Sequence, residues 1–123
     1  MGKFLQPQEI EVWYILPVIR RELAFAMKRK GLTGKRIADL LGVSEAAVSQ
    51  YFSNKRAKEI ALKENIKEHI NDMAEEIIKQ PVMIIPYTQA ILKMFWDDGI
   101  VCDLHKEHCK EVSADCDGCA LHE

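Results

Sequence analysis

Residues 33–52 read TGKRIADLLGVSEAAVSQYF, a pattern that predicts two short helices joined by a tight turn. Thr33 is a suitable N-cap for a first helix that runs to Leu41, because its hydroxyl can accept a hydrogen bond from the first turn. Gly42 falls at the turn, where a positive φ is least costly for glycine. Ser44 is a suitable N-cap for the second helix, which begins at the next residue. The segment therefore predicts two capped helices that pack against each other.

The apolar side chains of this segment fit two helices that cross at close range. Ala38 is small enough for the second helix to pass over the first. The side chains expected to point inward are Ile37, Leu41, Val43, Val48 and Tyr51. Those expected on the outer face are Ser44, Glu45, Ala46, Ser49, Gln50 and Ser53. Such a short, mostly polar face suits a helix that lies in the major groove of DNA.

This spacing resembles the helix-turn-helix of Cro/repressor-like (XRE-type) regulators. Ala38, Gly42 and Val48 match the small, glycine and branched aliphatic positions of that motif, and residues 48–56 resemble its recognition helix and the basic loop that follows. A wider resemblance, carried by VWYILPVIRREL at residues 12–23, the motif and the cysteine-bearing C-terminal segment, is to a group of short archaeal regulators. The resemblance implies a sequence-specific DNA-binding transcription regulator.

Roles on DNA follow from the chemistry of the side chains. Ser49 and Gln50 are expected at base edges, because a Gln amide can pair with adenine and a Ser hydroxyl with several bases. Glu45 either accepts a hydrogen bond from cytosine or only stabilises the positive end of its helix. The expected base contacts are Ser44, Glu45, Ser49, Gln50 and Ser53. The expected phosphate contacts are Thr33, Lys35, Arg36, Asn54, Lys55 and Arg56.

Charge is distributed unevenly along the chain. The 123 residues carry a net charge of −2, yet residues 20–63 hold 11 Lys and Arg against 4 acids, and residues 64–123 hold 5 against 13. The basic part is suited to DNA phosphates, and we expect the acidic part to face away from them. A helical hairpin that binds protein is the alternative, but it does not explain why the positive charge falls on the motif.

The other periodic segments are also helical, so the sequence predicts an all-α fold. The predicted helices are residues 8–14, 17–30, 33–41, 45–52, 58–79 and 86–98, with Pro17 and Pro86 at helix starts and Gly31, Pro81 and Gly99 at helix ends. We expect residues 1–57 to form the helix-turn-helix DNA-binding region and residues 58–98 a helical dimerisation and packing region. Residues 99–123 are expected to be a Cys-rich tail without helical periodicity.

A homodimer is expected, because one helix-turn-helix contacts only half a site and two recognition helices must lie about 34 Å apart to contact both halves. The candidate interface surfaces are the apolar stripe of residues 66–78, the helix of residues 86–96, and Trp13 with Tyr14. The alternative is that these surfaces pack only within the monomer. The aromatic side chains expected to anchor the core or an interface are Trp13, Phe25, Phe95 and Trp96.

All four cysteines lie in the last 22 residues: Cys102, Cys109, Cys116 and Cys119. In a cytoplasmic protein such a cluster favours a metal over disulfides. The favoured expectation is an iron–sulfur cluster held by the four thiolates. Zinc held by Cys102, His105, Cys116 and Cys119 is an alternative. The third possibility is no metal, with thiols that are free or paired in disulfides.

The sequence argues against a membrane protein and against an enzyme. No apolar segment approaches the roughly 18 residues of a membrane span, and the first residues lack a signal-peptide core, so a cytoplasmic location is expected. The Cys116-x2-Cys119 spacing can serve thiol redox chemistry, but the βαβ context of such enzymes is missing. The main hypothesis is a homodimeric regulator whose cysteine cluster senses redox state or metal supply. The alternative is an antitoxin or adaptor with a zinc-stapled tail.

Overall fold

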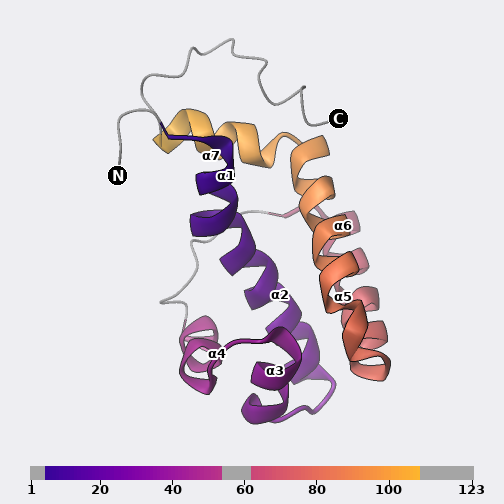
Figure 1. Ribbon diagram of the computed structural model, residues 1–123. Coiled ribbons are helices and arrows are strands. Elements are labelled where there is room, and N and C mark those ends of the chain that lie inside the picture. The colour runs from indigo at the N-terminus through magenta and orange to yellow at the C-terminus, as the bar shows by residue number, and fades with distance from the viewer. Residues whose placement is uncertain (1–4, 54–61, 109–123) are drawn as a thin grey trace.

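The computed structural model describes residues 5–53 and 62–108, and within those ranges every regular element is helical and no strand occurs (Figure 1). The elements are α1 (Pro7–Ile10), the π-helical turn η1 (Glu11–Ile15), α2 (Leu16–Arg29), α3 (Gly34–Leu41), α4 (Glu45–Phe52), α5 (Glu64–Lys79), the 3-10 turn η2 (Pro81–Met83), α6 (Ile84–Asp97) and α7 (Ile100–His108). The predicted all-α class is confirmed for this part of the chain. None of its helices has the length and apolar character needed to cross a membrane.

The first three elements form one continuous helical rod through the molecule (Figure 1). Pro17 lies in the first turn of α2, as predicted, but no break precedes it, because Ile10 and Leu16 on either side of η1 both have helical dihedral angles. A proline inside a helix has no N–H to donate, and its ring crowds the carbonyl one turn earlier. The wider π-helical turn accommodates this crowding. The predicted separation into two helices is therefore corrected.

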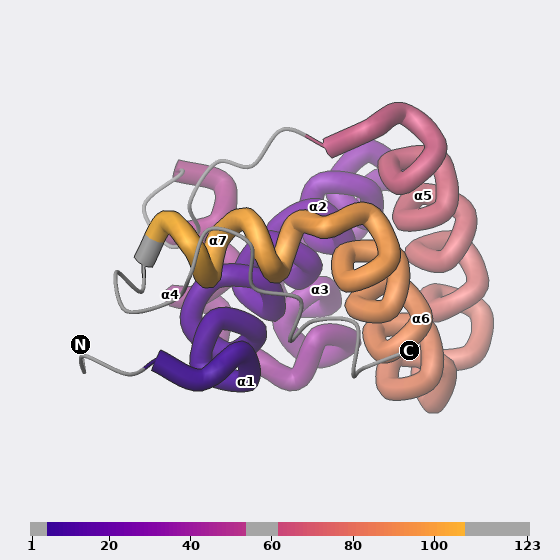
Figure 2. Tube along the Cα trace, turned by 90° about the horizontal axis from the view of Figure 1, so that it is seen from above, coloured from indigo at the N-terminus to yellow at the C-terminus, as the bar shows by residue number. Residues whose placement is uncertain are grey.

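The helices α5 and α6 lie side by side and cover one side of α2 (Figures 1 and 2). The buried residues of α5 are Ile66, Ile70, Ala74 and Ile77, which share one face because they are three or four residues apart. Ile91 and Phe95 of α6 are buried as well. The predicted apolar stripe is confirmed, and it is buried within the monomer.

Two predicted helix starts are shifted. α5 begins at Glu64, and Lys63 before it has an extended backbone. The prediction of a helix from Lys58 is therefore wrong at Leu62 and Lys63, and residues 54–61 lie outside the described part. α6 begins at Ile84, before Pro86. A proline is tolerated in the first turn because N–H groups there have no intrahelical acceptor.

The segment after Gly99 is helical as far as His108, which corrects the prediction of a tail without periodicity. Val101, Leu104 and His105 are buried, at the i, i+3, i+4 spacing of one helix face. α7 packs against α1 and crosses above it (Figure 2). The Nε2–H of His105 donates to the carbonyl oxygen of Leu5, so this hydrogen bond joins the two ends of the described chain.

The predicted aromatic anchors have different environments. Phe95 is completely buried, and Phe25 packs on Phe52 with ring centroids 5.4 Å apart. Trp96 is half-buried, and its Nε1–H donates to Glu11 Oε2 at 2.9 Å, which ties α6 to η1. Trp13 is 44% exposed. Three of the four therefore act as anchors within the monomer, and Trp13 lies at the surface.

Candidate nucleic-acid interface

The helices α3 and α4 are set by their caps and by the turn between them. The hydroxyl of Thr33 accepts from Arg36 N at 3.2 Å, and the hydroxyl of Ser44 accepts from Ala47 N at 3.0 Å. Gly42 has φ +70°, so it ends α3 in the left-handed conformation that glycine adopts most easily. The predicted caps and the predicted turn glycine are all confirmed.

The two helices pack against each other and against α2. The predicted inward-facing residues are buried or half-buried: Ile37, Ala38, Leu41, Val43, Val48 and Tyr51. Ala38 is only 3% exposed, as expected of a small residue where helices come close. Tyr51 and Phe52 then hold the end of α4 against the core, Tyr51 being 2% exposed and Phe52 packing on Phe25. We refer to these two helices as the α3–α4 pair.

All five predicted base-contacting residues are exposed: Ser44, Glu45, Ser49, Gln50 and Ser53. Their places relative to the ends of α4 differ. Ser44 caps α4, and the hydroxyl of Ser53 donates to the carbonyl of Gln50 at 3.1 Å. Ser49 and Gln50 lie in the body of α4, and neither caps a helix end. Ser49 and Gln50 are therefore exposed on the body of α4, whereas Ser44 and Ser53 lie at its two ends.

The predicted phosphate contacts are only partly within the described residues. Lys35 and Arg36 are exposed in the first turn of α3, next to the Thr33 cap. Asn54, Lys55 and Arg56 lie outside the described part of the chain. The two described cations and the N–H groups of this turn form one positively charged corner of the molecule.

One further cation beside α4 was missed by the sequence reasoning. Lys28, at the end of α2, is exposed, and its Nζ lies 5.4 Å from the centroid of the Phe52 ring. In sequence it is separated from α4 by the whole of α3, so only the packing of α2 on α4 reveals the proximity. Its neighbour Lys30 instead reaches Glu75 of α5 at 3.8 Å. Lys28 therefore places a further positive charge near the C-terminal end of α4.

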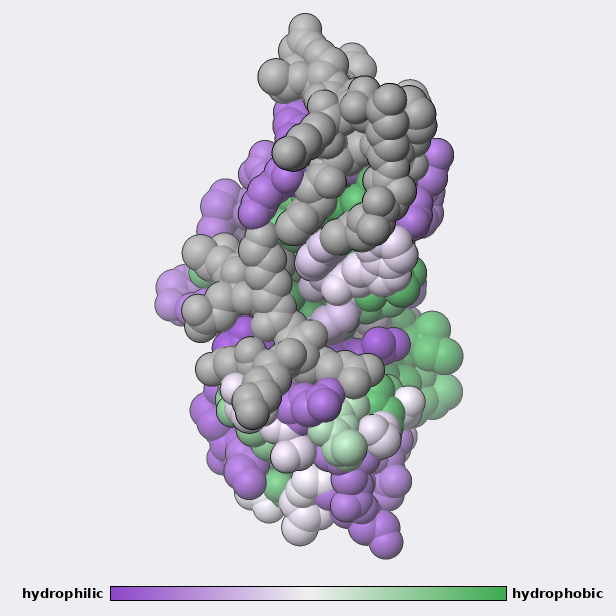
Figure 3. Space-filling model, turned by 90° about the vertical axis from the view of Figure 1, so that its left-hand side faces the viewer, coloured by the Kyte–Doolittle hydropathy of each residue, from purple (hydrophilic) through white to green (hydrophobic). Residues whose placement is uncertain are grey.

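Figure 3 shows the side of the molecule on which α4 lies. The lower end, where α3 and α4 are found in Figure 1, is mostly hydrophilic or neutral, and hydrophobic residues gather along one edge. A polar surface is what a helix face needs for contact with base edges and phosphates.

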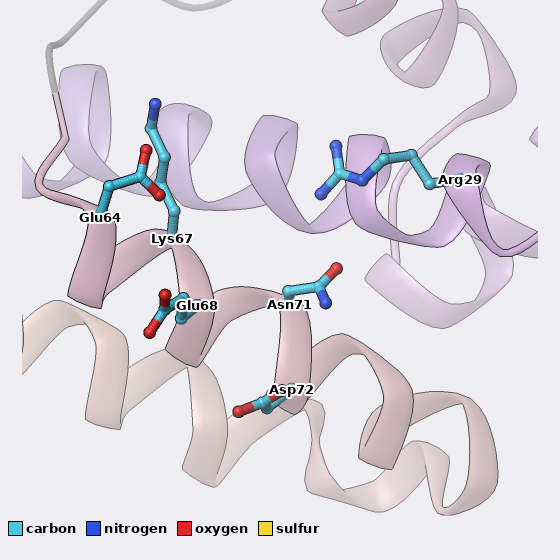
Figure 4. Close-up of a pocket in the computed structure, with 6 residues that line it drawn as sticks. All are labelled: Arg29, Glu64, Lys67, Glu68, Asn71 and Asp72. Carbon is cyan, nitrogen blue, oxygen red and sulfur yellow. The ribbon is translucent and has the colours of Figure 1, made fainter.

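A separate polar hollow lies between α2 and α5 (Figure 4). It is lined by Arg29, Glu64, Lys67, Glu68, Asn71 and Asp72. Because three carboxylates face two cations there, its charge is unsuited to a phosphate. It shares no residue with the α3–α4 pair, so it does not extend the candidate interface.

The predicted metal site is described only in part. Cys102 is half-buried on α7 and disulfide-bonded, and Cys109, Cys116 and Cys119 lie outside the described residues. His105 is buried, and its Nε2 is held by the Leu5 carbonyl, which leaves Nδ1 as the ring nitrogen that can bind a metal. Within residues 5–53 and 62–108, no three side chains of the His, Cys, Asp or Glu type converge as a metal site.

Comparison with known proteins adds no relative. No family model, no curated protein and no solved structure matches the chain. A function must therefore be inferred from the α3–α4 pair and the charges around it.

Proposed function

We propose that the protein is a sequence-specific regulator of transcription that binds double-stranded DNA with α4 in the major groove. The observation that carries the proposal is the α3–α4 pair: two capped helices, a left-handed Gly42 between them and a small Ala38 at the crossing. This combination is typical of a helix-turn-helix, in which the second helix reads base edges and the first crosses the phosphate backbone. The resemblance to XRE-type regulators supports the same function.

The charge around the pair supports this orientation. Lys28, Lys35 and Arg36 are exposed on α2 and α3, on the two elements that pack against α4. Cations and the N–H groups of a helix start are the common phosphate ligands of DNA-binding proteins. The excess of acids falls on residues 64–123, outside the α3–α4 pair. In sequence, the acidic excess is therefore separate from the residues proposed to contact DNA.

Within α4, Ser49 and Gln50 are the proposed base-reading residues. A Gln amide can donate to and accept from adenine at the same time, and a Ser hydroxyl can do either with several bases. Ser44 is proposed mainly as a cap, with its hydroxyl hydrogen still able to reach a phosphate or a base. Glu45, exposed in the first turn of α4, either accepts from cytosine or serves the helix dipole.

The test begins with selection of preferred duplexes from a random-sequence pool, followed by fluorescence anisotropy on the selected duplex. We expect the double variant Ser49→Ala/Gln50→Ala to lose roughly 10-fold to 100-fold in specific affinity, since a good base contact contributes about 1–3 kcal/mol. Gln8→Ala is the matched control, because Gln8 is exposed on α1 and far in sequence from α4. If no sequence is enriched, or if the double variant binds as tightly as Gln8→Ala does, the proposal is wrong.

For the C-terminal cysteines we propose a metal centre that forms in the reduced chain, on Cys102, Cys109, Cys116 and Cys119. A sulfur in a disulfide is not a thiolate ligand, so the disulfide at Cys102 must be reduced first. Such a centre would make the regulator responsive to redox state or metal supply.

Anaerobic purification with reductant, followed by an absorption spectrum and metal analysis of the same sample, tests this. Iron with acid-labile sulfide and broad visible absorbance supports an iron–sulfur cluster. One zinc per colourless chain supports the zinc-stapled antitoxin or adaptor instead. A reduced chain that holds neither metal contradicts both.

A further inference from the structure

Exposed apolar side chains adjoin a hollow between α2, α3 and α6. Val82 of η2 is 77% exposed, and Ile85 in the first turn of α6 is 71% exposed. The hollow beside them is lined by Leu16, Arg20, Asp39, Leu40, Ile84 and Ile85, among others. Exposed apolar side chains beside a mainly apolar hollow are unfavourable in water, and their free energy falls when another surface covers both. We refer to Val82 and the residues of this hollow as the α3–α6 face.

The α3–α6 face carries one charge of each sign. Arg20 of α2 and Asp39 of α3 both line the hollow, and Asp39 is exposed. The ion pairs found within residues 5–53 and 62–108 involve neither of them. A two-fold axis brings two identical patches together, so the cation of each copy can meet the anion of the other. A surface with one cation, one anion, a protrusion and a hollow is therefore complementary to itself.

We propose that the α3–α6 face pairs with the same face of a second copy of this chain in a two-fold dimer. Val82 and Ile85 of each copy enter the hollow of the other, and Arg20 of each copy faces Asp39 of the partner subunit. The biological meaning of this dimer rests on the proposed function. A helix-turn-helix protein needs two copies to contact two half-sites, and the α3–α6 face supplies the surface that joins them.

The position of the face is compatible with DNA binding. It includes Gly42 of the turn but no residue of α4, so the proposed base-reading face stays open in the dimer. The apolar stripe of α5 is buried inside the monomer and cannot serve. Val12 and Trp13 on η1 form the rival apolar surface, but neither of them lines the hollow that holds Arg20 and Asp39.

Sedimentation velocity of the full chain without DNA tests the proposal independently of DNA binding. We expect a dimer at micromolar concentration. Ile85→Glu should weaken it at least about 10-fold, because two carboxylates would enter an apolar interface. Val12→Glu is the matched control and should leave the dimer intact. Circular dichroism and thermal melting of each variant establish that it is folded.

A charge exchange tests the pairing across the axis. Arg20→Asp alone places two Asp–Asp pairs in the dimer, and Asp39→Arg alone places two Arg–Arg pairs there, so each should be monomeric. An equimolar mixture of the two variants restores both opposite-charge pairs and should form heterodimers. A pair formed within one chain would not give this rescue.

The outcomes separate this inference from the proposed function. A monomeric wild type, a dimer insensitive to Ile85→Glu, or a mixture that stays monomeric overturns the dimer assignment, whatever the DNA affinity is. If Val12→Glu abolishes the dimer and Ile85→Glu does not, the interface lies on η1. Failure to enrich any DNA sequence would overturn the proposed function while leaving a dimer found by sedimentation in place.

Discussion

The three serines of the α4 region have the same chemistry but different surroundings. Ser44 caps the helix at 3.0 Å, Ser53 donates to a carbonyl at 3.1 Å, and Ser49 is exposed in the middle of the outer face. A hydroxyl that accepts from a backbone N–H at a helix start contributes to stability, and the exposed hydroxyl of Ser49 is one that we propose contacts DNA. Substitutions at these serines should therefore have separable effects.

Ser44→Ala should lower the free energy of unfolding by about 1 kcal/mol, because the backbone N–H of Ala47 loses its side-chain acceptor. Ser49→Ala should change it by less than about 0.5 kcal/mol, as is usual for exposed sites, while weakening binding to the selected duplex. Urea denaturation measures the first effect, and anisotropy measures the second. Equal stability of the two variants would contradict the role of Ser44 as a cap.

The glycines at the two ends of α3, Gly34 in its first turn and Gly42 at its C-cap, provide a second contrast at the scale of the residue. Gly42 has φ +70° and Gly34 has no positive φ, and at neither would an added Cβ meet an atom within 4 Å. Gly42→Ala should destabilise by about 1 kcal/mol, through backbone conformation alone. Gly34→Ala should be neutral or stabilise by up to about 1 kcal/mol, since it restricts the unfolded chain. Thermal melting of both variants checks this, and a stabilising Gly42→Ala would refute it.

Among the elements, α5 differs most from its predicted role as part of a dimer interface. A long amphipathic helix is a usual dimerisation element, but its apolar face here packs on α2. Its start is also tied to the end of α6, because Lys63 Nζ lies 2.6 Å from Asp98 Oδ1. α5 is therefore part of the core of each monomer.

Ile77→Ala in α5 should lower the free energy of unfolding by about 2–5 kcal/mol, because Ile77 is completely buried and its loss leaves a cavity. Lys67→Ala, at an exposed position of the same helix, is the control and should have an effect within about 0.5 kcal/mol. Urea denaturation gives both values. If the loss for Ile77→Ala appeared only as dissociation of a dimer, with the monomer equally stable, α5 would be an interface helix after all.

On the scale of the whole molecule, basic and acidic residues are unevenly distributed along the chain, and the proposed orientation on DNA depends on this distribution. Lys28, Lys35 and Arg36 are exposed on elements that pack against α4, and the acidic excess belongs to residues 64–123. Each phosphate neutralised by a protein cation releases counterions and adds close to one unit to the slope of log affinity against log salt concentration.

Lys35→Ala should reduce the magnitude of that slope by about 1 per subunit and weaken binding to all sequences alike. Lys93→Ala is the control, because Lys93 lies on α6 and pairs with Asp97 at 2.9 Å. Anisotropy titrations over a range of salt concentrations measure both slopes. A slope changed equally by the two substitutions would place the DNA on a different surface.

Local rules explain which features were predictable. The caps at Thr33 and Ser44, the turn at Gly42 and the inward residues of α3 and α4 depend on neighbours within one or two turns, and all of them were predicted correctly. α7 was missed because its apolar signal is short, with Val101 and Leu104 as its only strongly apolar buried residues and His105 completing the face. The continuity of α1 with α2 was missed because a proline ordinarily marks a boundary.

The sequence by itself determined α3 and α4 with their caps, the apolar face of α5, and which face of α4 is polar, because these follow from hydrogen bonds and periodicity within a few residues. The tertiary structure alone decided what each apolar face packs against. It buried the α5 stripe in the monomer, left Val82 and Ile85 exposed beside a hollow, brought Lys28 next to α4, and set His105 against Leu5. These are contacts between residues far apart in the chain, and burial of apolar area is not directional, so periodicity identifies an apolar face without naming its partner.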